Sequence, residues 1–218
     1  AARCEILPYW RHPRLYHPST NSIQTKTDPN RPPSQTESPV TIADRNAEAA
    51  MRELIHRIHP THGIIGEEFG NHNADAEFVW VLDPIDGTKS FMTGKPLFGT
   101  LIGLCRDGVP LVGIIDQPVL EERWVGIVHH GTTLNGKVVQ TGDIVHNLSD
   151  AMMYTTDPQM FREGYELERF TSIRDAVKSP VYGGDCYSYA CVASGYADLV
   201  VEADLGVYDY AAIVPVIQ

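Results

Sequence analysis

The chain has 218 residues, of which 43% are hydrophobic and 21% are charged, a composition typical of a globular protein. With 17 Lys and Arg against 28 Asp and Glu, the formal net charge is -11, which argues against nucleic acid or an anionic membrane as a main partner. No apolar run is long enough to predict a membrane-spanning helix. The four cysteines lack CxxC spacing, which is typical of a reducing compartment.

The first quarter of the chain predicts two helical segments separated by a polar loop. Apolar residues 6–10 indicate the end of a short helix. Residues 17–39 are rich in Pro, Ser, Thr, Asn and Gln, and within them residues 17–37 are predicted to be a mobile loop. An amphipathic helix is predicted at residues 43–58, because apolar side chains recur at helical spacing. They are Ala47, Met51, Leu54, Ile55 and Ile58.

The rest of the chain predicts alternating strands and helices, which favours an α/β or α+β layered fold. Residues 98–105 and 111–116 predict a hairpin through Asp107-Gly108. Pro84 and Gly87 are expected to end the strand at residues 78–82. Further strands are expected at residues 64–65, 124–128, 151–155 and 197–202, and helices at residues 160–177, at residues 185–194 and from Asp209 onward.

The most informative motif is Asp83-Pro84-Ile85-Asp86-Gly87-Thr88, directly after an apolar strand. Mg²⁺ binds oxygen ligands, and a turn can direct both carboxylates to one point. The N–H groups of Gly87 and Thr88 can then bind a phosphate, as main-chain nests do. The motif therefore predicts a metal and phosphate site, against the alternative of a turn capped by aspartates.

Other carboxylates are candidates only in combination with this motif. The Glu67-Glu68 pair follows an apolar strand and shortly precedes the motif, so a shared carboxylate pocket is plausible. Asp44 and Asp209 each lie near the start of a predicted helix, where exposed N–H groups favour a carboxylate. Taken singly, each of these two aspartates is best interpreted as a helix cap.

Two competing sites have weaker support. His56, His59 and His62 are spaced by three, as in some zinc sites, but a solvated helix end is the favoured interpretation. Phosphatases that form an aspartyl phosphate usually have a D-x-D motif, whereas Asp83 and Asp86 are spaced D-x-x-D. The chain also lacks a Gly-x-Ser-x-Gly motif.

Taken together, these segments resemble the inositol monophosphatase family of Mg²⁺-dependent, Li⁺-sensitive phosphatases. The match covers about residues 38–218 in order and spacing, and a four-part match is far more specific than any single part. Its parts are Pro39-Val40-Thr41-Ile42-Ala43-Asp44, Gly66-Glu67-Glu68, the segment from Asp83 to Thr88, and Val207-Tyr208-Asp209-Tyr210-Ala211-Ala212. Within the family, the chain is most similar to histidinol-phosphate phosphatases, through residues 94–100, 115–118, 122–126, 154–156, 183–187 and 208–209.

The resemblance implies a set of metal ligands. A first Mg²⁺ would be held by Glu67, Asp83 and the main-chain carbonyl of Ile85. A second would be held by Asp83, Asp86 and Asp209, and Glu67 would also contact a third, weaker ion.

The resemblance also implies roles in catalysis and binding. Thr88, Asp44 and Glu67 are the implied catalytic residues, with Thr88 and Asp44 orienting the attacking water. Gly87 and Thr88 would bind the phosphate through their N–H groups, and Asp185 and Glu202 would face the substrate.

The implied fold is a layered α-β-α-β-α sandwich of the α/β (α+β) class, as in inositol monophosphatase and fructose-1,6-bisphosphatase, and is usually a homodimer. We expect residues 1–218 to form one domain whose C-terminal part is missing, because the chain ends at Gln218 within an apolar run. The expected location is the cytoplasm, with organelle import left open because the N-terminus looks incomplete.

The implied reaction is direct attack by metal-activated water on a phosphate monoester, and the implied substrate is L-histidinol phosphate in histidine biosynthesis. Inositol monophosphate and adenosine 3′,5′-bisphosphate are the alternative substrates. A phosphatase that works through an Asp83 phospho-enzyme, and an inactive fragment that binds metal and anions, are the alternatives of other kinds.

Overall fold

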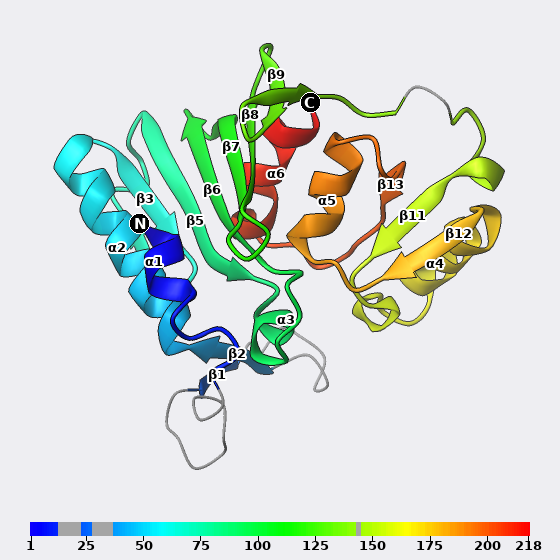
Figure 1. The fold of residues 1–218 in the computed structure, drawn as a ribbon, viewed down its shortest axis with the longest axis horizontal. Coiled ribbons are helices and arrows are strands. Elements are labelled where there is room, and N and C mark those ends of the chain that lie inside the picture. The colour runs from blue at the N-terminus through cyan, green and yellow to red at the C-terminus, as the bar shows by residue number, and fades with distance from the viewer. Residues whose placement is uncertain (13–22, 28–36, 143–144) are drawn as a thin grey trace.

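The computed structural model describes residues 1–12, 23–27, 37–142 and 145–218. Helices α1 (Ala2–Ile6) and α2 (Ile42–Ile58) cover one face of an eight-stranded sheet, and α5 (Cys186–Ala193) and α6 (Val207–Ile217) cover the other (Figure 1). A three-stranded sheet and α4 (Tyr165–Ala176) complete the series of layers. The α-β-α-β-α sandwich is therefore confirmed.

The eight-stranded sheet has the order β10-β9-β8-β7-β6-β5-β3-β4. Its strands pair antiparallel except β3 and β5, which are parallel. The predicted hairpin at residues 98–116 is confirmed by β6 and β7, and both turn residues, Asp107 and Gly108, have positive φ. The strands are β3 (Gly63–Gly66), β4 (Gly70–His72), β5 (Phe78–Asp86), β6 (Gly99–Arg106), β7 (Val109–Gln117), β8 (Glu122–Ile127), β9 (Gly131–Leu134) and β10 (Lys137–Val139).

The smaller sheet has the order β12-β11-β13 and is parallel, with strands β11 (Met152–Thr155), β12 (Ser179–Tyr182) and β13 (Leu199–Val200). The strands predicted at residues 151–155 and 197–202 are confirmed, the second as a short one. Two 3₁₀ helices, η1 (Leu148–Asp150) and η2 (Pro158–Met160), flank β11. Part of the helix predicted at residues 160–177 is therefore wrong, because α4 begins only at Tyr165, after Gly164.

The sequence predicted a polar loop at residues 17–39, but part of this segment forms strands. Strand β1 (Ile23–Thr27) pairs antiparallel with β2 (Glu37–Thr41). The loop prediction is wrong for these strands because a ladder of main-chain hydrogen bonds does not require an apolar face. Residues 17–22 and 28–36 lie outside the described residues, so the prediction of a mobile loop there stays a prediction.

The strand that carries the Asp83 motif also differs from expectation, because β5 continues through Pro84 to Asp86. Proline removes a ladder donor, which a sheet tolerates at irregular positions. Here the register between β5 and β6 shifts between Asp83 and Asp86. Gly87, with φ of 85°, then ends the strand as predicted and precedes α3 (Thr88–Met92).

Helix α6 lies unusually close to the large sheet. Gly113 of β7 and Gly126 of β8 are paired in register, and a Cβ atom on either would clash with the α6 main chain at Ala212 or Pro215. These glycines therefore set the distance at which α6 places Asp209 over the sheet. Pro215 lies inside α6. None of the helices in the described ranges has the length and apolarity needed to cross a membrane.

Candidate active site

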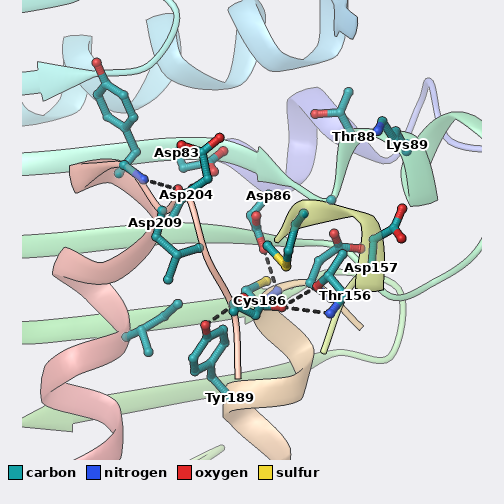
Figure 2. A pocket seen from close by; sticks show the side chains of 18 of the residues that line it. Asp83, Asp86, Thr88, Lys89, Thr156, Asp157, Cys186, Tyr189, Asp204 and Asp209 are labelled. Atoms are coloured by element: carbon teal, nitrogen blue, oxygen red, sulfur yellow. Dashed lines mark hydrogen bonds between the residues drawn. The ribbon is translucent and has the colours of Figure 1, made fainter. Parts of the chain in front are cut away.

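A cavity of about 490 Å³ is lined by residues from β5, α3, η2, α5 and the segment leading into α6. Figure 2 shows Asp83 and Asp209 on one side of it and Thr88 and Lys89 on another. Lys89 is the single basic side chain among the described lining residues. The carboxylates are Glu67, Asp83, Asp86, Asp157, Asp185, Glu202, Asp204 and Asp209, so the cavity is strongly acidic.

Three of these carboxylates converge at the centre of the predicted metal site. Oxygen atoms of Asp83, Asp86 and Asp209 all lie within 4.8 Å of one another. Burial, followed by the negative charge of Glu67, raises the pKa of Asp83 well above its ordinary value. Burial and the charge of Asp185 likewise raise the pKa of Asp86, although the Cys186 N–H donates to Asp86 Oδ2 at 2.5 Å.

This cluster suits a divalent cation. Asp83 is 3% exposed, and its buried Oδ1 has no hydrogen-bond partner within the described part of the chain. Buried polar atoms are normally satisfied, and an all-oxygen ligand set is the one that Mg²⁺ prefers. A bound cation would give Asp83 Oδ1 a partner and offset the repulsion among the three carboxylates.

Glu67 and Asp44 lie near this cluster. The charge of each raises the pKa of Asp83, so both lie near it. Glu67 lines the cavity, in the turn after β3. Asp44 is 1% exposed and is not among the lining residues.

Asp44 caps the start of α2, as the sequence predicted. Asp209 caps the start of α6 and also belongs to the carboxylate cluster. Asp44 Oδ2 accepts hydrogen bonds from Thr41 N at 2.8 Å and Thr41 Oγ1 at 2.5 Å, in a capping box of α2. Burial raises the pKa of Asp44 to about 7, although these hydrogen bonds oppose the shift. Asp209 Oδ2 accepts from Gly206 N at 2.6 Å at the start of α6.

Ile85, Gly87 and Thr88, at the end of the Asp83 motif, also line the cavity. The Thr88 hydroxyl donates to the Ile85 carbonyl at 3.0 Å, while the Ile85 side chain is buried in the core. Gly87 and Thr88 lead into α3, where the first N–H groups of a helix have no partner inside the helix. No hydrogen bond joins Thr88 to Asp44 among the described residues, so their shared role in orienting water stays a prediction.

Asp185 precedes α5, yet its side chain makes no capping hydrogen bond to that helix. Its Oδ2 instead accepts from Ser90 Oγ at 2.9 Å. A Cβ atom on Gly87 would lie 2.8 Å from the same oxygen, so this carboxylate packs directly on the motif. Burial raises the pKa of Asp185 to about 6, and the Ser90 hydrogen bond opposes this rise.

Glu202 is held by two residues that the sequence did not single out for any role. Its Oε1 accepts from Thr156 N at 3.0 Å and from Thr156 Oγ1 at 2.5 Å, and its Oε2 accepts from Tyr189 OH at 2.6 Å. Thr156 Oγ1 also accepts from the Asp185 N–H at 3.1 Å. Thr156 lies 46 residues from Glu202 in the chain, so no local pattern could have revealed this network.

The histidine alternative is not supported. Asp83, Asp86 and Asp209 form the one group of three or more potential metal ligands in the described ranges. His59 and His62 stack with ring centroids 4.6 Å apart, and Trp80 Nε1 donates to His62 Nδ1 at 3.0 Å. These rings therefore pack against each other beyond the end of α2.

A model of the family described as "Inositol monophosphatase family" matches residues 15–218, nearly the whole chain. The chain belongs to the inositol monophosphatase family. This confirms the resemblance inferred from the four motif segments, and the fold is that of solved members.

Similar proteins carry both kinds of name that the sequence had suggested. "Bifunctional phosphatase IMPL2, chloroplastic" from Arabidopsis thaliana is 53% identical over 83% of this chain and 52% of its own length, so the chain spans about half of that relative. A histidinol-phosphatase from Chlorobaculum parvum is 34% identical over 84% of this chain and 70% of its own. A solved inositol monophosphatase from Zymomonas mobilis is 40% identical, with a TM-score of 0.80 over 99% of this chain and 77% of its own.

Proposed function

We propose that this protein is a Mg²⁺-dependent phosphatase that hydrolyses a phosphate monoester by direct attack of water. The observation that carries the proposal is the convergence of Asp83, Asp86 and Asp209 within 4.8 Å in an acidic cavity. Family membership supports the same reaction class. Bound Mg²⁺ would lower the pKa of the attacking water and neutralise charge on the phosphate and the leaving oxygen.

The proposed division of labour follows the arrangement of the residues. Asp83, Asp86, Asp209 and Glu67 would hold two or three Mg²⁺ ions together with the Ile85 carbonyl, whose bond from Thr88 leaves it a second lone pair. The remaining residues act on the substrate and the water. Gly87 and Thr88 would donate main-chain N–H groups to the phosphate, and Thr88 and Asp44 would orient the water.

The proposed substrate is L-histidinol phosphate, which carries an amine and an imidazole. Among the described lining residues, carboxylates outnumber the single basic side chain, Lys89, and this favours a substrate whose non-phosphate end is cationic. Asp185 is the main candidate for the amine, since no hydrogen bond to its Oδ1 is found in the described part of the chain. The naming of a relative as histidinol-phosphatase supports this choice. Inositol monophosphate remains the second candidate, supported by the solved Zymomonas relative.

Phosphate release from histidinol phosphate, inositol monophosphate and adenosine 3′,5′-bisphosphate, with and without Mg²⁺, tests the proposal. We expect release only with Mg²⁺ and the highest kcat/KM for histidinol phosphate. Full activity after exhaustive chelation would contradict the metal dependence, and a trapped acyl phosphate would indicate an Asp83 phospho-enzyme. Binding of Mg²⁺ and phosphate without turnover would indicate an inactive binding protein.

The homodimer and the cellular location stay predictions. Sedimentation of the purified protein tests the first. For the second, the chloroplastic naming of the Arabidopsis relative supports an organelle, and the cysteine pattern supports a reducing compartment such as the cytoplasm. Imaging of the tagged full-length protein distinguishes the two locations.

A further inference from the structure

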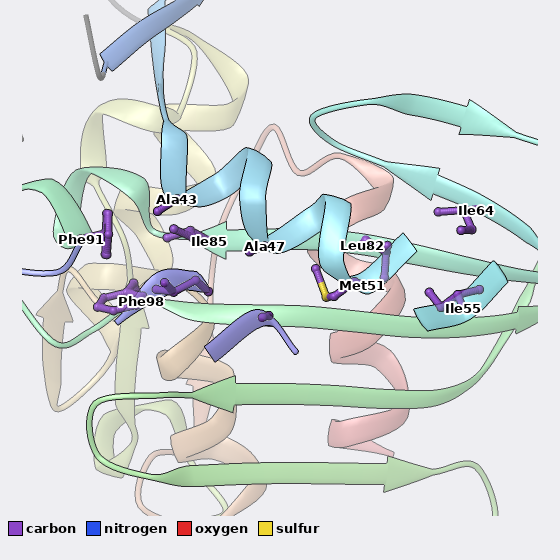
Figure 3. Close-up of a cluster of buried hydrophobic side chains, with 11 residues drawn as sticks. Ala43, Ala47, Met51, Ile55, Ile64, Leu82, Ile85, Phe91 and Phe98 are labelled. Carbon is purple, nitrogen blue, oxygen red and sulfur yellow. The ribbon is translucent and has the colours of Figure 1, made fainter. Parts of the chain in front are cut away.

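Helix α2 carries a row of largely buried polar residues beside its row of apolar residues. Asp44, Glu48 and Arg52 follow one another at intervals of four residues, so they lie along one side of the helix. The apolar row packs on the large sheet (Figure 3) and comprises Ala43, Ala47, Met51 and Ile55.

Glu48 is the centre of this polar row and is fully buried, with 0% exposure. Its Oε1 accepts from Arg52 Nε at 2.7 Å and from Phe69 N at 3.2 Å, and its Oε2 accepts from Glu68 N at 2.7 Å. Arg52 Nη2 donates to the Gly70 carbonyl. The Glu48–Arg52 ion pair therefore binds main-chain groups of the turn between β3 and β4 and fixes that turn.

Glu67 lies inside this turn. Its own N–H donates to the Leu82 carbonyl of β5 at 3.1 Å, so three successive N–H groups, from Glu67 to Phe69, are fixed by β5 and Glu48. A Cβ atom on Gly66 would clash with Glu48 Oε1. The close approach of the glutamate therefore requires glycine immediately before Glu67.

We propose that Glu48, oriented by Arg52, is a positioning residue for the metal site. It fixes the turn so that Glu67 faces Asp83, and it acts through Glu67 without touching the metal itself. A buried ion pair is a poor way to gain stability alone, because desolvation offsets its attraction. Hydrogen-bonded partners behind a metal ligand, in contrast, orient that ligand and tune metal affinity. This inference rests on the proposed Mg²⁺ site.

Glu48→Gln is the decisive variant, and Glu53→Gln is its matched control, because Glu53 lies on the same helix and is exposed. Mg²⁺ titrations of the metal-free proteins are followed by melting temperature and, separately, by phosphate release. In Glu48→Gln we expect the half-saturating Mg²⁺ concentration to rise about 10- to 100-fold in both titrations. The KM for substrate at saturating Mg²⁺ should change less than about twofold, since Glu48 does not line the cavity. Glu53→Gln should match wild type throughout.

An unchanged half-saturating Mg²⁺ concentration in Glu48→Gln would overturn the positioning role, as would a loss of kcat or a rise in KM with no change in Mg²⁺ response. If Glu48→Gln does not fold, Arg52→Lys decides, because it keeps the charge beside Glu48 but removes the planar group that reaches Gly70. Wild-type Mg²⁺ half-saturation in Arg52→Lys would then overturn the proposal. A wild-type protein that binds Mg²⁺ but hydrolyses no phosphate would refute the proposed function, and the melting titrations would still test Glu48.

Discussion

Asp83 on the large sheet and Glu202 just after the last strand of the small sheet line one cavity, but their hydrogen bonding differs. Asp83, on the large sheet, has a buried oxygen with no hydrogen bond from any described residue, among carboxylates that raise its pKa. Glu202, beyond the small sheet, has both oxygens bound by Thr156 and Tyr189. A carboxylate whose two oxygens accept hydrogen bonds from the protein is held in place as part of the cavity lining. A buried carboxylate that lacks such a bond and is repelled by neighbouring carboxylates is suited to bind a cation.

Removing the charge of Asp83 should have the largest effect of the changes that test the contrast between Asp83 and Glu202. Asp83→Asn keeps the shape of the side chain but loses the central negative charge of the cluster, so we expect activity to fall about 1,000-fold or more. The same change relieves like-charge repulsion, so the metal-free protein should melt at a higher temperature than wild type. Steady-state turnover and thermal unfolding in chelator measure the two effects.

Asp157→Asn is the matched control, since Asp157 lines the same cavity and caps Gln159 N with an oxygen that Asn retains. It should leave both quantities nearly unchanged. Asp44→Asn should cost less activity than Asp83→Asn, because Asp44 does not line the cavity. Wild-type turnover by Asp83→Asn at saturating Mg²⁺ would refute the metal assignment.

The substrate side of the comparison is tested by Asp185→Asn beside Glu202→Gln. Asp185 Oδ1 accepts no hydrogen bond from the described residues and is the proposed acceptor for the substrate amine. A hydrogen bond to a charged group is worth about 1.5–3 kcal/mol, roughly ten- to a hundredfold in kcat/KM. Asp185→Asn should lose that factor for histidinol phosphate and leave a neutral phosphate ester nearly unchanged.

Glu202→Gln should instead affect both esters equally, because it disturbs Thr156 and, through it, the Asp185 main chain. Equal losses on both esters for Asp185→Asn would make Asp185 a structural residue. A selective loss in Glu202→Gln would show that its hydrogen bonds to the protein do not prevent it from reading the substrate.

The large-sheet part of the site could be predicted because its motifs are local. The segment from Asp83 to Thr88 comes after an apolar run, and Asp209 lies in the first turn of a helix, so each can be recognised from a few neighbouring residues. What the sequence could not supply was the register shift that lets β5 continue past Pro84, because that depends on the pairing with β6.

Other elements carried signals that were missed. The hairpin of β9 and β10 turns at Asn135-Gly136, both with positive φ, and this dipeptide is a strong hairpin signal. Glu48 and Arg52 have the favourable order for a helical ion pair, which is visible in the sequence. Their contact with the turn at Glu68 could not be predicted, because it depends on how α2 packs beside β3.

The smallest expected effect is a pH dependence of stability in the metal-free protein. The folded state raises the pKa of Asp83 and Asp86, and that of Asp44 to about 7, above an ordinary value of 3.8. Between the ordinary pKa of 3.8 and the raised pKa values, the folded protein therefore binds more protons than the unfolded one. Its stability falls as the pH rises through this range. His62, whose pKa is lowered by burial, opposes this trend, but it is a single group against several carboxylates.

Each pKa unit corresponds to about 1.4 kcal/mol, and each kcal/mol moves the melting temperature of a chain of this size by about 2–4 °C. With chelator present, we expect melting at pH 8 to occur roughly 5 °C or more below that at pH 5.5. Because Mg²⁺ binds the ionised carboxylates, its stabilising effect should be larger at pH 8 than at pH 5.5. Asp83→Asn should flatten both dependences, while Glu202→Gln should leave them intact. If the metal-free protein melted at a higher temperature at pH 8 than at pH 5.5, the pKa values of Asp83 and its neighbouring carboxylates would not be raised in the folded state. The contrast between Asp83 and Glu202 would then be wrong.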